Sequence, residues 1–469
     1  MNYDVMVIGS GPGGYVAAIR AAQLGFKVGV VERAELGGIC LNWGCIPTKA
    51  LLKSAGVFQY FQHAAEFGVS AGEVKADYPA MVKRSREVAE AMSKGVQFLF
   101  NKNKITHIPG TGKVLPGKKV VVTKVGSGQS AAGTATEEYT ANHIIIATGA
   151  RSRELPNLKQ DGKKIIGYRE AMNLPEQPGS MVVVGSGAIG SEFAWFYHSI
   201  GTKVTLVELL PNIVPIEDEE VSKTLERSFK KAGMKVMTNA TVEKVDTSGK
   251  GCKVTVKTKK GEELIEADIV LSAVGIAPNT EGIGLEETGI KTDKGKIVVD
   301  EFYRTNVPGY YAIGDIVHGP ALAHVASHEG ILCVEKIKGM EVEPLDYNNL
   351  PSCTYTHPEI ASVGFTEKAA REAGYEIKVG NFPFSASGRA RASGAREGFV
   401  KVIFDAKYGE WLGAHMIGEN VTEMIAGVVA ARKLETTGRE IIDTVHPHPT
   451  MSEAIMEAVA QAYGECIHL

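Results

Sequence analysis

Cys40 and Cys45 are the side chains of this sequence whose type and spacing most directly suggest redox chemistry. Five residues along a regular helix advance about 7.5 Å, whereas disulfide-linked α-carbons lie about 4.4–6.8 Å apart. A bridge between the two cysteines therefore requires an irregular backbone, and Gly44 and Pro47 are residue types expected at such a place. Spacing alone leaves three interpretations open, namely a redox pair, a metal site and two unrelated thiols near a helix start.

A second cluster of chemically capable residues lies near the C-terminus, where the proline-rich segment 446–449 is followed by Thr450 and Glu453. The prolines exclude helix around His448 and present its imidazole on a rigid loop. Glu453 has two interpretations. It can form a capping box with Thr450, or it can accept a proton from His448 and orient that imidazole as a general base. A metal site of His446 and His448 is the third interpretation, but the two histidines have no adjoining carboxylate or cysteine ligand, and we predict no metal site.

Redox chemistry needs an electron carrier, and the N-terminal segment contains a pattern for one. A buried strand expected over 3–8 leads into Gly9, Gly11 and Gly14 of a G-x-G-x-x-G motif, and a helix is expected over 15–24. The first glycine allows a tight turn, the second lets the backbone approach a pyrophosphate, and the third lets helix and strand pack closely. Glu32, at the end of the next expected strand, suits ribose hydroxyls.

The same pattern recurs 176 residues later, with Gly185, Gly187 and Gly190 in the motif and Glu208 as the acid. A repeat of this kind is a stronger signal than either copy and predicts two dinucleotide sites. An acid at this position favours NAD over NADP, and residues 209–212 contain no basic side chain that could bind a 2′-phosphate. We therefore expect NAD at the second site and FAD at the first.

Two further strands are expected to close these units, over 144–149 and 269–275, and they place Thr148, Gly149 and Gly275 beside the cofactors. A third strand ends at Asp315, which could bind a polyol hydroxyl or cap the following helix. The stretch 126–136 reads as a solvated loop. Together the patterns predict an α/β fold with two Rossmann-like dinucleotide-binding domains and a C-terminal α+β domain.

Composition narrows the class of protein. The formal net charge is −3 and 22% of the 469 residues are charged, which provides no basic field for nucleic acid. No apolar run approaches the roughly 20 residues of a membrane span, and the N-terminus lacks the pattern of a secretory signal. Six scattered cysteines are no disulfide framework. We therefore expect a cytoplasmic protein with no nucleic-acid or membrane partner.

In their order along the chain, these motifs resemble the pyridine nucleotide-disulfide oxidoreductases, and most closely the members that oxidise dihydrolipoamide. The segments that carry the resemblance are 9–14, 40–49, 185–190, 314–315, 355–364 and 446–453. The resemblance implies domains over 1–149 (FAD-binding), 150–275 (NAD-binding), 276–346 (central, completing the FAD site) and 347–469 (interface). Two residues depart from the family pattern: Trp43 replaces a smaller apolar residue, and Ile276 stands where an arginine is common.

The resemblance also implies roles for individual residues. Cys40 and Cys45 would form the redox disulfide, with Cys40 facing the substrate and Cys45 facing the flavin. His448 would be the base and Glu453 its orienting partner, serving the disulfide of the other subunit in a homodimer. Beside the flavin, Lys49 would pair with Glu192 and Asp315 would contact the ribitol.

The activity implied in this way is oxidation of protein-bound dihydrolipoamide with reduction of NAD. The enzyme would be a shared component of 2-oxo acid dehydrogenase or glycine cleavage complexes, and its partner a lipoylated acyltransferase component or H protein. An alternative within the family is an NADPH-dependent disulfide or mercuric reductase, which Glu208 disfavours. An alternative outside it is a non-enzymatic metal-binding scaffold that uses Cys40, Cys45, His446 and His448.

Overall fold

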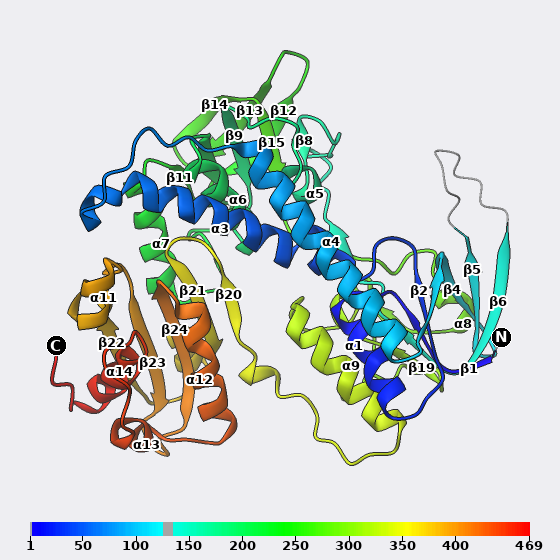
Figure 1. The fold of residues 1–469 in the computed structure, drawn as a ribbon. Coiled ribbons are helices and arrows are strands. Elements are labelled where there is room, and N and C mark those ends of the chain that lie inside the picture. Colours follow the sequence, from blue (N-terminus) through cyan, green and yellow to red (C-terminus); the bar gives the residue numbers. More distant parts are fainter. Residues whose placement is uncertain (1, 125–134) are drawn as a thin grey trace. The chain divides into compact units, whose positions relative to one another are not determined.

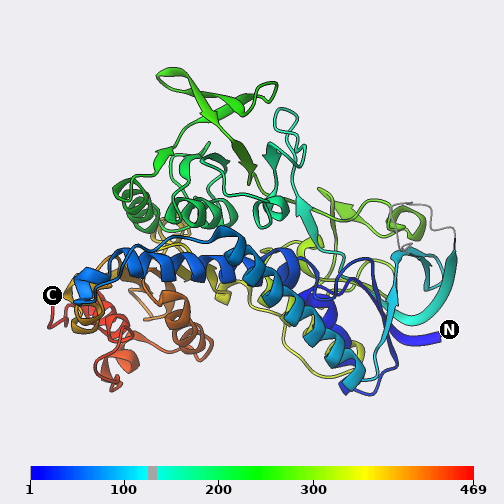
Figure 2. The same cartoon turned by 45° about the horizontal axis from the view of Figure 1, so that its top comes forward.

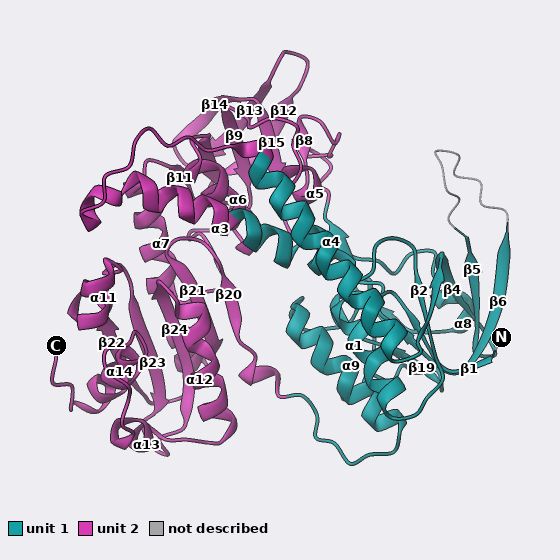
Figure 3. Ribbon diagram, in the orientation of Figure 1, with its two compact units in different colours: residues 1–51, 80–153, 276–345 teal, residues 52–79, 154–275, 346–469 magenta. Residues whose placement is uncertain are grey.

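The computed structural model describes residues 2–124 and 135–469. Figure 3 shows its two compact units, of which unit 1 comprises residues 1–51, 80–153 and 276–345, and unit 2 comprises residues 52–79, 154–275 and 346–469. Unit 1 combines most of the expected FAD-binding segment with the central segment, and unit 2 combines the expected NAD-binding and C-terminal segments. The division into four domains stays a prediction.

Unit 1 is built on a seven-stranded sheet with the order β3-β2-β1-β6-β5-β4, in which β19 pairs with β6. Strands β3, β2, β1, β6 and β19 run parallel, and β6, β5 and β4 form an antiparallel meander. The strands are β1 (Asn2–Ile8), β2 (Val28–Glu32), β3 (Thr106–Pro109), β4 (Thr111–Leu115), β5 (Lys119–Thr123), β6 (Thr136–Ile146) and β19 (Tyr310–Ala312). The expected loop over 126–136 falls almost entirely outside the described residues.

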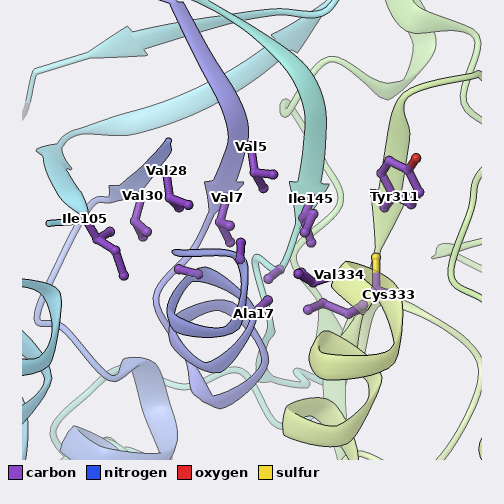
Figure 4. Packing of buried hydrophobic residues seen from close by; sticks show 14 of the residues in the cluster. Val5, Val7, Ala17, Val28, Val30, Ile105, Ile145, Tyr311, Cys333 and Val334 are labelled. Atoms are coloured by element: carbon purple, nitrogen blue, oxygen red, sulfur yellow. The ribbon is translucent and has the colours of Figure 1, made fainter. Parts of the chain in front are cut away.

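Helices α1 (Pro12–Gln23) and α9 (Ala323–Ile337) cover one face of this sheet. Figure 4 shows Val7 and Ile145 of adjacent parallel strands pointing toward Ala17 of α1 and Val334 of α9. Strands buried on both faces read as continuous apolar runs, which is why 5–8 and 144–146 contain almost no polar residue. The sequence pattern predicts a long helix over 82–98, and the helix in the structure, α4 (Tyr78–Lys102), is 25 residues long and extends beyond this range at both ends.

Unit 2 contains a parallel five-stranded sheet with the order β11-β10-β9-β15-β8. Its strands are β8 (Ile165–Ile166), β9 (Ser180–Val184), β10 (Lys203–Val207), β11 (Lys235–Met237) and β15 (Ile269–Ser272), and its helices include α5 (Tyr168–Ala171), α6 (Ala188–Ser199) and α7 (Glu219–Lys231). An antiparallel three-stranded sheet, formed by β12 (Thr241–Asp246), β13 (Cys252–Thr258) and β14 (Gly261–Ala267), is a feature that the sequence patterns did not predict.

The C-terminal part of unit 2 is an antiparallel sheet with the order β20-β21-β24-β23-β22, against which α12 and α14 pack (Figure 1 and, from another side, Figure 2). The elements are β20 (Ser352–Thr354), β21 (Glu359–Gly364), β22 (Ile377–Pro383), β23 (Phe399–Asp405), β24 (Trp411–Gly418), α10 (Glu367–Glu372), α11 (Gly388–Ser393), α12 (Val421–Lys433), α13 (Gly438–Asp443) and α14 (Glu453–Tyr463). The fold class expected from the sequence is confirmed. The chain has two α/β parts, each built on a sheet with parallel strands, and a C-terminal α+β part.

Candidate active site

The two cysteines lie on either side of a break between two helices. Helix α2 (Gly38–Trp43) ends at Gly44, and α3 (Cys45–Gln62) begins at the next residue. The backbone of Gly44 adopts φ −142° and ψ −119°, which is far from helical. A Cβ at Gly44 would lie 3.0 Å from the Ile39 carbonyl oxygen and 3.2 Å from the Cys40 Cα, so a side chain here would be crowded against the backbone that carries Cys40. The irregularity that the cysteine spacing requires is therefore present, at one of the two expected residues.

The break brings the two thiols together. Cys40 is half-buried and Cys45 is exposed, and the Cys40 thiol is hydrogen-bonded with Cys45. This hydrogen bond and burial raise the pKa of Cys40, while the charge of Lys49 lowers it by a smaller amount. Because thiolates and not thiols react with disulfides, a dithiol held in this way needs a proton acceptor. The order of the two sulfurs relative to the flavin stays a prediction.

Side-chain hydrogen bonds fix the backbone on both sides of the break. Asn42, which is buried, donates from Nδ2 to the carbonyl oxygens of Leu36 (2.9 Å) and Gly38 (3.0 Å). Thr48 donates from Oγ1 to the Gly44 carbonyl oxygen at 2.7 Å. Buried polar groups satisfied in this manner hold a single local conformation. The pair of thiols therefore lies on rigid backbone.

His448 and Glu453 meet as the catalytic interpretation requires. His448 lies in the loop between α13 and α14, and its Nδ1 is 2.9 Å from Glu453 Oε1. The other carboxylate oxygen, Oε2, accepts a hydrogen bond from the Thr450 N–H at 2.8 Å. Of the predicted capping box, only the hydrogen bond from the Thr450 N–H to Glu453 is formed, because the Thr450 hydroxyl donates to the Pro447 carbonyl oxygen and the N-cap of α14 is Ser452. This hydrogen bond is compatible with the orienting role, since one oxygen of Glu453 holds the backbone before α14 and the other holds the imidazole.

The electrostatics of this pair suit a base. Burial acts to raise the pKa of Glu453, but the hydrogen bonds from the Thr450 N–H and from His448 outweigh it and lower that pKa. An ionised Glu453 accepts a hydrogen bond from Nδ1–H, which leaves Nε2 as the basic nitrogen. The His448 side chain is 78% exposed and that of Glu453 26%, so the imidazole is accessible to another molecule.

The glycines of the first fingerprint divide into two kinds. A Cβ at Gly9, where φ is +101°, would lie 2.2 Å from the Ala147 carbonyl oxygen, and one at Gly14 would lie 2.0 Å from the Gly9 carbonyl oxygen. A Cβ at Gly11 would meet no described atom within 4 Å. The fold therefore needs Gly9 and Gly14 but not Gly11. A glycine with free space above it, at the start of a helix with no acid in its first turn, fits close approach of a pyrophosphate.

The second fingerprint has the same division. A Cβ would lie 2.4 Å from the Ala273 carbonyl oxygen at Gly185, where φ is +95°, and 1.9 Å from the Gly185 carbonyl oxygen at Gly190. Around Gly187, which precedes α6, a Cβ would again find open space within 4 Å among the residues that the structure covers. The repeat in the sequence is therefore matched by a repeat of the same close contacts. In each unit the turn between strand and helix has open space at its second glycine, Gly11 or Gly187, and we call this turn a glycine cradle.

The acids of the two units are held in matching ways. Glu32 accepts hydrogen bonds from the N–H and hydroxyl of Ser10 (2.8 and 2.7 Å) and from Ala34 N–H (2.9 Å). Glu208 accepts from the N–H and hydroxyl of Ser186 (2.9 and 2.7 Å) and from the Leu210 N–H (2.8 Å). A carboxylate has about four acceptor sites, so each acid keeps about one for a ribose hydroxyl. The two serines escaped our sequence reading, although they obey the same offset of 176.

The strand-end residues are placed as follows. Thr148 donates from Oγ1 to the Asn279 carbonyl oxygen at 2.7 Å, and Gly149 has φ +67°. Gly275, with φ +107°, directly precedes β16 (Ile276–Pro278), which pairs with β7 (Ala150–Ser152). Ile276 thus begins a short strand.

The remaining predicted cofactor residues are distributed over both units. Asp315 lies in a short 3₁₀ turn, and burial raises its pKa. It does not cap the next helix, because the N-cap of α9 is Leu322, so the capping interpretation of Asp315 is wrong. Glu192, which is buried, accepts a hydrogen bond from the Tyr355 N–H at 2.9 Å. Lys49 belongs to unit 1 and Glu192 to unit 2, and their pairing stays a prediction.

The described residues contain neither a cluster of metal ligands nor a membrane-spanning helix. Within residues 2–124 and 135–469, no three His, Cys, Asp or Glu side chains are grouped so that they could hold a metal ion. Among the helices of the described chain, none is long and apolar enough to cross a membrane.

Comparison with known proteins identifies the family. The family model described as pyridine nucleotide-disulphide oxidoreductase matches residues 3–330, and the model of the dimerisation domain of the same family matches residues 350–459. The chain belongs to the pyridine nucleotide-disulphide oxidoreductase family. The helix break with its two thiols and the two glycine cradles are therefore those of an oxidoreductase of this family.

Individual members resemble the chain over its whole length. A dihydrolipoyl dehydrogenase of Rhizobium etli is 50% identical over 479 residues, covering 100% of this chain and 99% of that protein. A dihydrolipoyl dehydrogenase of Zymomonas mobilis is 48% identical over 469 residues, covering 100% and 99%. The crystal structure of LpdA from Mycobacterium tuberculosis superposes with a TM-score of 0.88 at 30% identity and covers 97% of this chain and 98% of that one.

Proposed function

We propose that the chain is an NAD-dependent dihydrolipoyl dehydrogenase, which oxidises dihydrolipoamide carried on a lipoylated protein. The observation that carries the proposal is the pair of thiols held in contact across the Gly44 break. The identity of the substrate is proposed from relatives that match the whole chain and are named for this activity. The cradles at Gly11 and Gly187 fit the FAD and NAD that such enzymes use.

In this proposal the residues of the chain perform the following steps. His448, held by Glu453, takes a proton from one thiol of dihydrolipoamide. The resulting thiolate attacks the Cys40 sulfur of the disulfide, and Cys45 leaves as a thiolate. The second substrate thiol then displaces Cys40, so that lipoamide leaves with its ring closed and the protein keeps two reduced cysteines. FAD, when bound, carries the two electrons onward from the dithiol to NAD.

Lys49, Thr148, Gly149, Asp315, Glu192 and Gly275 are proposed as the further cofactor contacts. Of these, Asp315 is well suited to a polyol hydroxyl, because a half-buried carboxyl with a raised pKa gains from a hydrogen-bond donor. Glu208 and the absence of basic residues over 209–212 support NAD over NADP.

One assay tests the activity. Oxidation of dihydrolipoamide by the purified protein with NAD is expected, with a rate at least about tenfold above that with NADP. Cys45→Ser is expected to abolish this reaction while leaving the protein yellow. Retained activity in Cys45→Ser would rule out the disulfide role, and a preference for NADPH with glutathione or mercuric ion would favour the alternative reductase.

The homodimer has a separate test. We propose that the His448–Glu453 pair of one copy serves the cysteines of a second copy, consistent with a dimerisation domain over 350–459. Coexpression of Cys45→Ser with His448→Ala then gives mixed dimers with one intact site, and about a quarter of the wild-type activity is expected from random pairing. No gain over the separately expressed variants would show that each chain uses its own pair.

A further inference from the structure

Trp43, which departs from the family pattern, is contacted by an arginine from α4. The guanidinium carbon of Arg86 lies 4.4 Å from the centroid of the Trp43 ring, within the range of a cation–π interaction. The same guanidinium donates from Nη1 to the Asn42 carbonyl oxygen at 2.7 Å. Arg86 therefore binds the two residues that immediately precede the break at Gly44.

The position of this contact matters because α2 is only six residues long. The last carbonyl groups of a helix have no donor within that helix, and Gly44 turns the chain away before α3 can supply one. Arg86 provides a donor to one of these carbonyls. Both contacts hold residues that lie between Cys40 and Cys45, so they restrain the segment of chain that joins the two cysteines.

The preceding residues of α4 hold the other side of the break. Ser85, which is fully buried, donates from Oγ to the Pro47 carbonyl oxygen at 2.9 Å. Arg84 donates from Nη1 to the Ala50 carbonyl oxygen at 2.8 Å. Of the two arginines, Arg86 contacts the segment between the cysteines, whereas Arg84 contacts α3 beyond them. Arg84 is thus a matched control from the same helix.

We propose that Arg86, acting through Trp43 and the Asn42 carbonyl, is a positioning residue that sets the equilibrium between the dithiol and the disulfide of Cys40 and Cys45. Holding one sulfur against the other raises its effective concentration and favours the bond. This inference rests on the proposed redox role of the pair. In the measurable reaction with oxidised glutathione, the protein S–S bond forms, the glutathione S–S bond breaks, and the two protons and two electrons end on two glutathione thiols.

The test is the equilibrium constant of this reaction, measured on the holoenzyme in glutathione buffers by alkylation of free thiols and mass spectrometry. Arg86→Met and Trp43→Val are each expected to lower the constant about tenfold, the factor that loss of one partly desolvated cation–π contact gives. The double variant is expected to match Arg86→Met, because the ring contact that Trp43→Val removes is already lost when Arg86 is replaced. Arg84→Met is expected to stay within about twofold of the wild type, because its contact lies beyond the pair.

Clear results would contradict the inference. A constant for Arg86→Met within about twofold of the wild type, or an equal shift in Arg84→Met, would overturn it. If Arg86→Met does not fold, Trp43→Phe should keep the wild-type constant where Trp43→Val does not, and equal constants would overturn the inference as well. A wild-type protein that forms no Cys40–Cys45 disulfide would instead overturn the proposed function, because this measurement needs neither dihydrolipoamide nor NAD.

Discussion

Replacing Glu217 with glutamine is expected to remove a pH-dependent loss of stability. Glu217 is 8% exposed and lies just before α7, packed against the C-terminal sheet of unit 2. Burial raises its pKa from 4.5 to about 7; a hydrogen bond with Ser362 lowers it, and the charge of Asp218 raises it. Its Oε2 has no hydrogen-bond partner in the described part of the chain, so an ionised carboxylate here would keep an unpaired oxygen.

The sign follows from proton binding. Between pH 4.5 and about 7 the folded protein keeps the Glu217 proton that the unfolded chain has lost. Stability must then fall as pH rises through this window, because the folded state binds more protons. The interval between 4.5 and about 7 corresponds to about 3 kcal/mol. Glutamine imitates the protonated carboxyl and cannot ionise, so this loss disappears.

Urea denaturation of wild type and Glu217→Gln at a series of pH values measures the effect. Their difference in unfolding free energy is expected to grow by up to about 3 kcal/mol in favour of the variant between pH 4 and pH 8. Asp218, Lys401 and Glu367 titrate outside this window, with the acids lowered and the lysine raised in pKa. Burial lowers the pKa of the nearby His415, which makes the unfolding free energy rise with pH. This contribution is the same in the wild type and in the variant, so it cancels in their difference.

The difference in unfolding free energy between the two proteins therefore reports the ionisation of the Glu217 carboxyl alone. A difference that does not change with pH would refute the argument, because a neutral glutamine and an ordinary exposed glutamate differ in charge but not in pH-dependent folding. A difference that changes in favour of the wild type at high pH would show that the folded state stabilises the ionised form.

Four further substitutions have definite expected outcomes. Lys401→Met should destabilise the protein by about 3–5 kcal/mol in urea, because Lys401 and its partner Asp218 are each 3% exposed and 3.0 Å apart. Gly187→Ala should leave the melting temperature unchanged and raise the KM for NAD at least about tenfold, whereas Gly190→Ala should fail to fold stably, since its Cβ would lie 1.9 Å from a carbonyl oxygen. Glu453→Gln should lower kcat for dihydrolipoamide oxidation about 100-fold while NADH-dependent dye reduction persists.

Much of the fold could be predicted because the relevant signals are local. The strands β1, β2, β9 and β10 are short apolar runs that end at glycine turns or acids, and their interpretation needs no distant contact. Each G-x-G-x-x-G motif alone is a weak signal. Because the second motif repeats the first at a constant offset of 176 residues, the two together strongly predict two dinucleotide sites. The first strand, expected over 3–8, begins one residue earlier in the structure, at Asn2.

Contacts between distant segments could not be predicted. Lys401 and Asp218 are 183 residues apart, and each alone looks like an ordinary charged surface residue. The same is true of Arg86, which lies on a helix for which the sequence suggested no chemistry and which contacts the redox segment 44 residues earlier. The antiparallel β12-β13-β14 sheet was missed because its outer strand β14 is largely exposed and carries charged residues in place of a buried apolar run.

Glu453 shows why a residue with a sufficient structural role can still be functional. The sequence set a capping role against an orienting role, as if one glutamate could serve only one of them. A carboxylate has two oxygens, and in the structure Oε2 binds the Thr450 N–H while Oε1 binds His448. Fixing the carboxylate through the backbone also fixes the imidazole, because both hydrogen bonds are accepted by the same carboxylate group. The structural role is therefore what gives the base its orientation, and glutamine at this position should keep the former while losing the charge that the latter needs.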